Sequence, residues 1–82
     1  MEKYVSCKWI ADNLGVSSLT IVYYLFHLRL NRIAKDDGFY VNLETAKELI
    51  IFTCSKFGLD TNKYIKELVE HYQKIDDDND VN

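Results

Sequence analysis

The sequence predicts a single, mainly α-helical domain with one small two-stranded hairpin. Three observations carry this prediction. Apolar residues recur at helical spacing in four segments, capping residues or glycines lie at the ends of these segments, and an Asp-Gly pair separates two short runs between the second and third of them. A chain of 82 residues makes one domain, and an apolar content of 48% is sufficient for a packed core.

The first two predicted helices are short and adjacent. Ser6 caps a helix over residues 7–14, and Gly15 ends it because a left-handed backbone is accessible without strain only to glycine. Ser17 caps the next helix, which we expect to continue to about Leu30. The short connection makes these two helices close neighbours.

A two-stranded hairpin is expected after the second helix. The segments Arg32–Lys35 and Phe39–Asn42 flank the turn sequence Asp36-Asp37-Gly38. An Asp-Gly pair favours a tight turn because both of its residues tolerate positive φ.

Two longer helices complete the predicted domain. One spans Leu43–Phe57, between the capping residue Asn42 and the stop residue Gly58. The other is amphipathic and runs from residues 60–61 to about Ile75. Both have apolar faces that need a cover, which only the rest of the domain or a second subunit can supply.

The charges divide the chain into a domain over residues 1–75 and an acidic tail over residues 76–82. The tail holds four acids and no base, so we expect it to be disordered. The remainder carries 10 basic and 9 acidic residues, and residues 1–35 alone carry five basic and two acidic ones. The positive charge is therefore concentrated in the N-terminal half.

Residues 7–24 have the pattern of a helix-turn-helix motif. Ala11 is small where two helices cross, and Gly15 lies four residues later in the turn. Ile21 and Tyr24, three residues apart on the second helix, face back toward the first helix and hold the two at a fixed angle. The opposite face of the second helix is left for DNA.

From Tyr4 to about Leu49 the chain resembles the winged helix-turn-helix domains of the MerR-like and excisionase-like group. The shared order is a first helix, a Gly-Val-Ser turn at residues 15–17, a second helix, a hairpin and a following helix. The resemblance implies a recognition helix in the major groove and a wing along the adjacent backbone or minor groove. It also implies a small regulator that binds duplex DNA in a sequence-dependent way, either a transcriptional repressor or a recombination or excision accessory factor.

Nine residues are expected to contact DNA. In helix-turn-helix proteins the start of the second helix and its next turn reach the bases, where hydroxyl groups donate hydrogen bonds and Leu19 packs on a thymine methyl group. The resemblance places phosphate-neutralising groups at the end of this helix and on the first wing strand. The alternative for each of these residues is an ordinary surface charge that contacts only solvent. The expected set is Lys8, Ser17, Ser18, Leu19, Thr20, Tyr23, Arg29, Arg32 and Lys35.

Two other function classes compete with DNA binding. The net charge of -3 and the lack of Arg, Asn or Gln at the base-contacting positions leave a second hypothesis, a protein-binding adaptor or antirepressor on the same scaffold. No enzyme, metal site or cofactor is expected, because paired carboxylates, a nucleophile with its base, a phosphate loop and metal-ligand spacing are all missing. Cys7 and Cys54 are expected to be reduced packing thiols in a cytoplasmic protein without membrane association.

The apolar faces of the two C-terminal helices predict a homodimer built on them. One recognition helix contacts only a few base pairs, and two copies on a symmetric site gain affinity. The alternative is a monomer in which the fourth helix packs back over the third.

Overall fold

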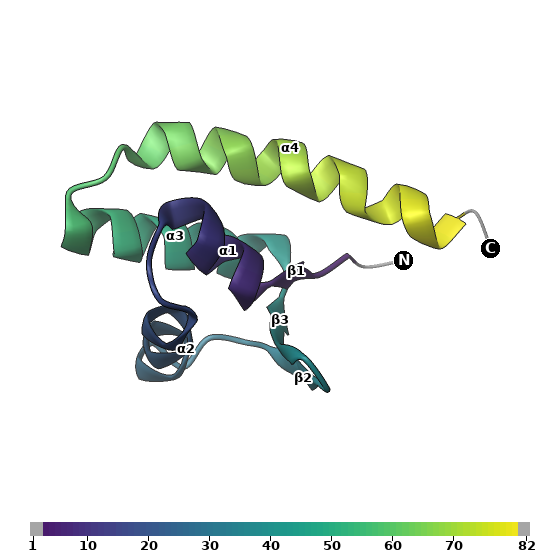
Figure 1. The fold of residues 1–82 in the computed structure, drawn as a ribbon, viewed down its shortest axis with the longest axis horizontal. Coiled ribbons are helices and arrows are strands. Elements are labelled where there is room, and N and C mark those ends of the chain that lie inside the picture. The colour runs from purple at the N-terminus through teal and green to yellow at the C-terminus, as the bar shows by residue number, and fades with distance from the viewer. Residues whose placement is uncertain (1–2, 81–82) are drawn as a thin grey trace.

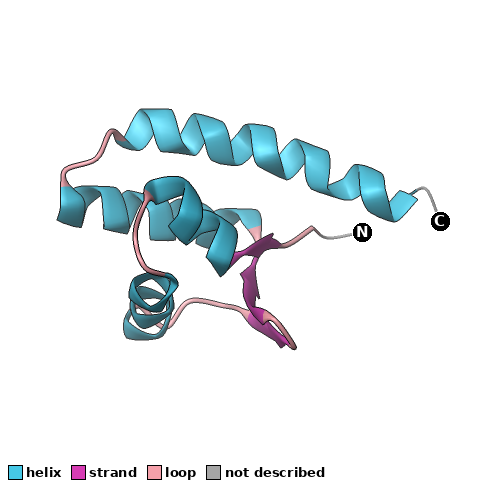
Figure 2. Cartoon of the chain, viewed as in Figure 1, coloured by secondary structure: helices cyan, strands magenta, loops and turns pink. Residues whose placement is uncertain are grey.

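The computed structural model describes the backbone of residues 3–80 and the side chains of residues 3–75. Over that range the chain forms four helices and one antiparallel sheet (Figure 1), with loops between them as Figure 2 shows. The elements are β1 (Val5–Ser6), α1 (Cys7–Leu14), α2 (Ser18–His27), β2 (Ile33–Lys35), β3 (Gly38–Val41), α3 (Leu43–Phe57) and α4 (Thr61–Asp80). The prediction of a mainly α-helical domain is confirmed.

The starts of the first three helices agree with the sequence because each depends on a local cap. The side-chain oxygens of Ser6, Ser17 and Asn42 each accept a hydrogen bond from a backbone N–H two or three residues later, at 2.9 to 3.1 Å. Such a bond satisfies one of the N–H groups that have no partner in the first turn of a helix. Each cap therefore sets the residue at which its helix begins.

The ends of α1, α2 and α3 share one backbone motif. In each, an N–H group donates to the carbonyl oxygen five residues earlier, at 3.0 to 3.1 Å, and the residue before the donor has a positive φ. That residue is Gly15 in the turn after α1 (φ 76°) and Gly58 after α3 (φ 68°). After α2 it is Arg29, with φ 57°.

The left-handed turn at Arg29 corrects the predicted length of α2. The helix ends at His27, three residues before the expected end at Leu30, because the chain reverses where the Leu30 N–H bonds to the Leu25 carbonyl. A left-handed backbone costs a non-glycine residue about 1 to 2 kcal/mol. Arg29 is the one non-glycine residue among those described that carries this strain.

The sheet has three strands where the sequence predicted two. β3 lies in the centre, between β1 and β2, and Val5 of β1 pairs with Val41 of β3. Both valines are fully buried, so the pairing brings two apolar residues that are 36 positions apart in the sequence into one core. A strand of two residues is too short to show an alternating pattern, which explains why the sequence did not reveal β1.

The hairpin turn also differs from the prediction. Lys35 pairs with Gly38, so the two turn residues are Asp36 and Asp37 rather than the Asp-Gly pair. Among the described residues of the hairpin, only Gly38 has a positive φ, at 131°. The hairpin lies where the sequence predicted it, but the turn residues Asp36 and Asp37 do not adopt the positive φ that an Asp-Gly pair tolerates.

The core is enclosed by all four helices, and α2 lies on the side away from α4. In Figure 1, α4 runs across α3 and α1 at the top, whereas α2 and the β2–β3 hairpin project below them. Ile10 of α1, Ile21 and Leu25 of α2, and Leu49 and Ile50 of α3 are fully buried. This arrangement leaves the outer face of α2 uncovered by the rest of the chain.

The apolar stripe of α4 is covered within the same chain. Leu68 is fully buried, and the half-buried residues Ile65, Tyr72 and Ile75 pack against the same core. The monomeric alternative therefore accounts for this stripe, and a homodimer through the C-terminal helices stays a prediction. No helix in the described range has the length and apolar character needed to cross a membrane.

α4 extends further than the sequence indicated. Its backbone is helical to Asp80, five residues beyond the expected end at Ile75. The side chains of residues 76–80 and all of residues 81–82 lie outside the described part of the chain. The expected disorder of the acidic tail stays a prediction.

A stacked pair of rings joins α4 to α1. The rings of Trp9 and His71 are 3.9 Å apart between centroids and 5° from parallel. Beside them, the Asn13 amide donates to the Glu67 carboxylate at 2.9 Å. Burial, and secondarily the charge of Lys74, lower the pKa of His71, so the folded domain favours the neutral imidazole.

We expect this stack to make stability depend on pH. As pH falls below about 6.5, the unfolded chain takes up a proton at His71 before the folded chain does, so the free energy of unfolding decreases. The variant His71→Phe keeps a ring against Trp9 and should lose part of that decrease. Melting temperatures measured between about pH 5.5 and 7.5 test this. Equal pH dependence in the parent and the variant would contradict it.

Candidate nucleic-acid interface

The outer face of α2 carries a row of exposed apolar side chains. Leu19, Tyr23 and Phe26 lie four and three residues apart, which places them along one side of the helix. Their side chains are 78%, 65% and 45% exposed, while Ile21 and Leu25 on the inner face are fully buried. We call these three residues the α2 ridge. The inner face of α2 is anchored in the core, and the opposite face exposes this ridge to solvent.

A groove separates the start of α2 from the hairpin. It has a volume of about 290 Å³ and is lined by Ser18 and Leu19 of α2, Lys8 of α1, and Asp37 and Phe39 of the hairpin, among others. The structure thus brings together three of the predicted DNA contacts. The lining combines an ammonium group, a carboxylate, hydroxyl groups and apolar surface at the N-terminal end of α2.

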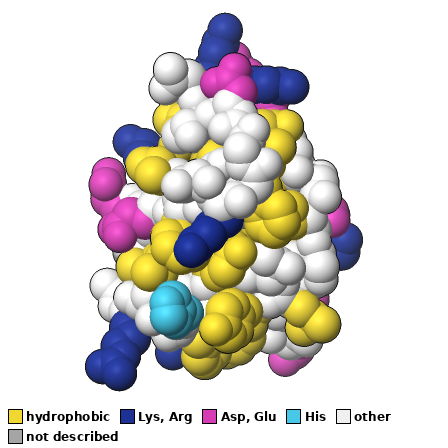
Figure 3. Space-filling model, turned by 90° about the vertical axis from the view of Figure 1, so that its left-hand side faces the viewer, with side chains coloured by type: hydrophobic (Ala, Val, Ile, Leu, Met, Phe, Trp, Pro, Cys, Tyr) yellow, Lys and Arg dark blue, Asp and Glu magenta, His cyan; other side chains and the backbone are white. Residues whose placement is uncertain are grey.

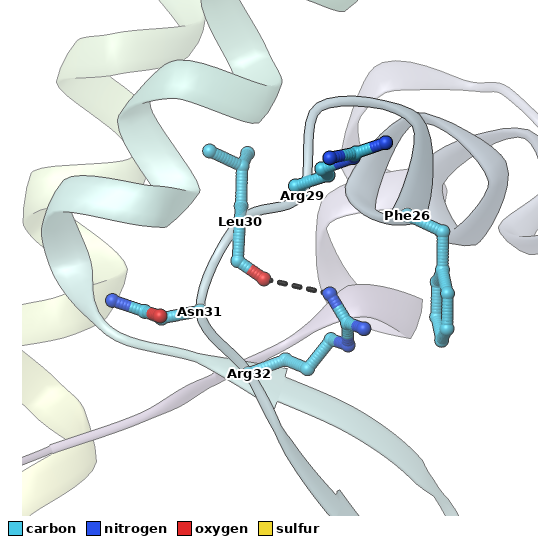
Figure 4. A pocket seen from close by; sticks show the side chains of 5 residues that line it. All are labelled: Phe26, Arg29, Leu30, Asn31 and Arg32. Atoms are coloured by element: carbon cyan, nitrogen blue, oxygen red, sulfur yellow. Dashed lines mark hydrogen bonds between the residues drawn. The ribbon is translucent and has the colours of Figure 1, made fainter.

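A second hollow, of about 390 Å³, lies at the other end of α2 (Figure 4). The Arg32 guanidinium is 3.9 Å from the centroid of the Phe26 ring and donates to the Leu30 carbonyl oxygen at 2.8 Å. These two contacts hold the guanidinium in place. Arg29 lines the same hollow, together with Asn31. Two arginines without an acidic residue in the lining suit a phosphate group.

Other predicted contacts already have partners or are less accessible. Lys8 forms an exposed ion pair with Asp12 at 2.9 Å, and such pairs contribute only about 0 to 1 kcal/mol, so a phosphate can compete for the lysine. The Ser17 hydroxyl caps α2, and Thr20 is half-buried. Lys35 lies 4.4 Å from the centroid of the Tyr40 ring on the hairpin.

The tip of the hairpin is acidic. Asp36 and Asp37 are both exposed, and the Asp37 carboxylate accepts a hydrogen bond from the Tyr40 hydroxyl at 2.9 Å. This bond raises the pKa of Tyr40. The tip is therefore unsuited to contact a phosphate. Of the predicted hairpin cations, Arg32 precedes β2, far from the tip, whereas Lys35 lies directly beside the two aspartates.

Aromatic side chains that the sequence analysis did not select lie beside the predicted contacts. Phe26 meets Phe39 of the hairpin edge to face at 5.3 Å, and Phe52 of α3 meets Tyr24 at 4.8 Å. Lys56 lies over the Phe52 ring at 5.2 Å. Figure 3 shows apolar side chains gathered near basic side chains and a histidine in the lower part of that view. Phe26 could have been selected from the sequence, because it lies seven residues, or about two helical turns, after Leu19 and so on the same side of the helix.

The two thiols belong to the core rather than to this surface. Cys7 and Cys54 are both buried, and neither forms a disulfide bond. Burial raises the pKa of Cys7 to about 11 and also raises that of Cys54, which keeps both protonated near neutral pH. Among the described residues, no three His, Cys, Asp or Glu side chains are grouped closely enough to hold a metal ion.

Comparison with protein-family models, curated proteins and solved structures finds no match to this chain. Its function is therefore inferred from its own residues. They place the exposed outer face of α2 between a groove with an ammonium group and a carboxylate at one end and a hollow with two guanidinium groups at the other.

Proposed function

We propose that this chain binds duplex DNA through α2 and acts as a small DNA-binding regulator of the winged helix-turn-helix kind. In this proposal α1 and α2 form the helix-turn-helix, α2 enters the major groove, and the β2–β3 hairpin is the wing. The observation that carries it is the exposed outer face of α2, flanked at its two ends by Lys8 and by Arg29 with Arg32. Major-groove width admits one helix of this kind.

The order and spacing of the elements support the proposal. The short turn between α1 and α2 keeps the two helices in contact, and Ala11 of α1 and Ile21 of α2 are both fully buried. In this proposal the basic residues contact the phosphates on either side of the groove. Lys35, next to the hairpin tip and over the Tyr40 ring, is the fourth cation of the proposed contact set.

Binding to duplex DNA at increasing salt tests this function. Four phosphate contacts predict that the logarithm of the binding constant falls with the logarithm of salt concentration with a slope of about -3 to -4. Fluorescence anisotropy of a labelled mixed-sequence duplex measures this slope directly. A single strand of the same sequence serves as the control for duplex preference.

Two results would contradict the proposal. One is the absence of binding at about 50 mM salt, where phosphate contacts are strong. The other is binding with no salt dependence, because a contact that releases no counterions does not involve the phosphates.

A second candidate function is favoured by one observation. The α2 ridge is apolar, and the hairpin tip beside it is acidic, which suits a protein partner. In that case the chain would be an adaptor or antirepressor that uses the helix-turn-helix scaffold for protein binding. The duplex assay separates the two candidates because only the first predicts a salt-dependent complex with DNA.

A further inference from the structure

The exposed face of α2 lacks the side chains that distinguish most base pairs. Ser18–His27 contains no Arg, Lys, Asn, Gln, Asp or Glu. Two-point contacts to guanine and adenine need Arg, Lys, Asn or Gln, and cytosine is best contacted by a carboxylate. A helix with this composition must discriminate bases in another way.

The α2 ridge supplies apolar contact instead. The C5-methyl group of thymine is the apolar group that unmodified DNA presents in the major groove. Leu19 has the most exposed of the large apolar side chains described, and it lies in the first turn of α2, the part of a recognition helix that meets base edges. The Ser17 cap on the Leu19 N–H holds this turn in place.

The three ridge residues differ in how free they are to contact a ligand. Phe26 is covered on one side by the Arg32 guanidinium and meets Phe39 at its edge, so its ring is engaged within the protein. Tyr23 stacks on His27 at 5.8 Å and keeps most of its ring exposed. Leu19 and Tyr23 are therefore the ridge residues available to a ligand.

We propose that α2 selects thymine-containing duplex DNA through the 5-methyl groups, with Leu19 as the specificity-determining residue and Tyr23 beside it. The inference rests on the proposed duplex binding and deepens it. The cations at both ends of the ridge favour DNA as its occupant, because Lys8 and the arginine pair would contact phosphates on both sides of the methyl groups. In this proposal the cations supply affinity for the phosphates, and the apolar ridge supplies selection for thymine.

Methyl-group exchange in otherwise identical duplexes tests the inference. One duplex carries thymine, and a second carries deoxyuridine at every thymine, which removes the methyl group and keeps the base pairing. Burial of one methyl group corresponds to about a fourfold change in affinity, so two contacts predict a preference on the order of tenfold for thymine. A G·C duplex with 5-methylcytosine should likewise bind more tightly than one with cytosine.

Two variants connect the preference to the ridge. Leu19→Ala should reduce the thymine preference to a few-fold or less while the salt slope stays unchanged, because the phosphate contacts remain. Leu19 is highly exposed, so the variant should fold, and circular dichroism checks this. Ile51→Ala removes an exposed apolar side chain of α3 and should keep the full preference.

The possible failures are distinguishable. If the parent binds thymine and deoxyuridine duplexes equally with a normal salt slope, the methyl inference is overturned and duplex binding stands. If Leu19→Ala keeps the full preference, Leu19 is not the specificity-determining residue. If no duplex is bound, both proposals are overturned, and the α2 ridge is then assigned to a protein partner.

Discussion

Leu68→Ala is expected to lower the free energy of unfolding by about 2 to 5 kcal/mol. Leu68 is the fully buried residue of α4 among those described, and it lies in the core that α4 shares with α3. A small domain has only about 5 to 15 kcal/mol of stability in total, and each kcal/mol shifts the melting temperature of a domain this size by about 4 to 8 °C. A decrease of at least about 8 °C should therefore appear in thermal unfolding followed by circular dichroism.

Lys66→Ala is the matched control for this substitution. Lys66 lies on the same helix and is exposed, so its loss should change stability by less than about 0.5 kcal/mol. Equal melting temperatures for Leu68→Ala and the parent would contradict the docking of α4 on the core. Stability that is independent of protein concentration would further support a core completed within one chain.

The double variant Arg29→Gly with Arg32→Ala is expected to weaken duplex binding on the order of tenfold to a hundredfold and to reduce the salt slope by about 2. Both residues line the hollow at the end of α2. Glycine is the sharper substitution at residue 29, because it removes the cation and also relieves the strain of the positive φ. The variant should therefore fold at least as well as one with alanine at that position.

The matched control changes two charges elsewhere. Lys63 and Lys66 are exposed on α4, which lies on the other side of the molecule from α2 (Figure 1). Lys63→Ala with Lys66→Ala produces the same change in net charge and should leave the salt slope unchanged. If both double variants lose affinity equally, overall charge rather than the arginine hollow governs binding.

Thermal unfolding separates strain from charge at residue 29. The single variant Arg29→Gly should melt no lower than the parent, since the other two helices that end in the same motif have glycine there. Weaker binding without loss of stability would mean that the arginine is retained for its charge. Loss of both would show that its side chain also supports the fold.

The sequence by itself determined the features that depend on a few adjacent residues. The starts of α1, α2 and α3 follow from caps such as Ser17, and the ends of α1 and α3 follow from Gly15 and Gly58. The exposed residues at the start of α2 could be selected from their position on the predicted helix, whereas the arginines and Lys35 were selected through the resemblance to winged helix-turn-helix domains.

Only the tertiary structure decided the features that depend on contacts between distant segments. β1 exists because Val5 pairs with Val41 in the core. α4 covers α3 because Leu68 is buried in that same core. The left-handed turn at Arg29 carries no glycine to reveal it, yet it ends α2 and brings two arginines into one hollow. Burial of apolar side chains from separate segments supplies the free energy that makes such pairings and such strain stable, and no local pattern records it.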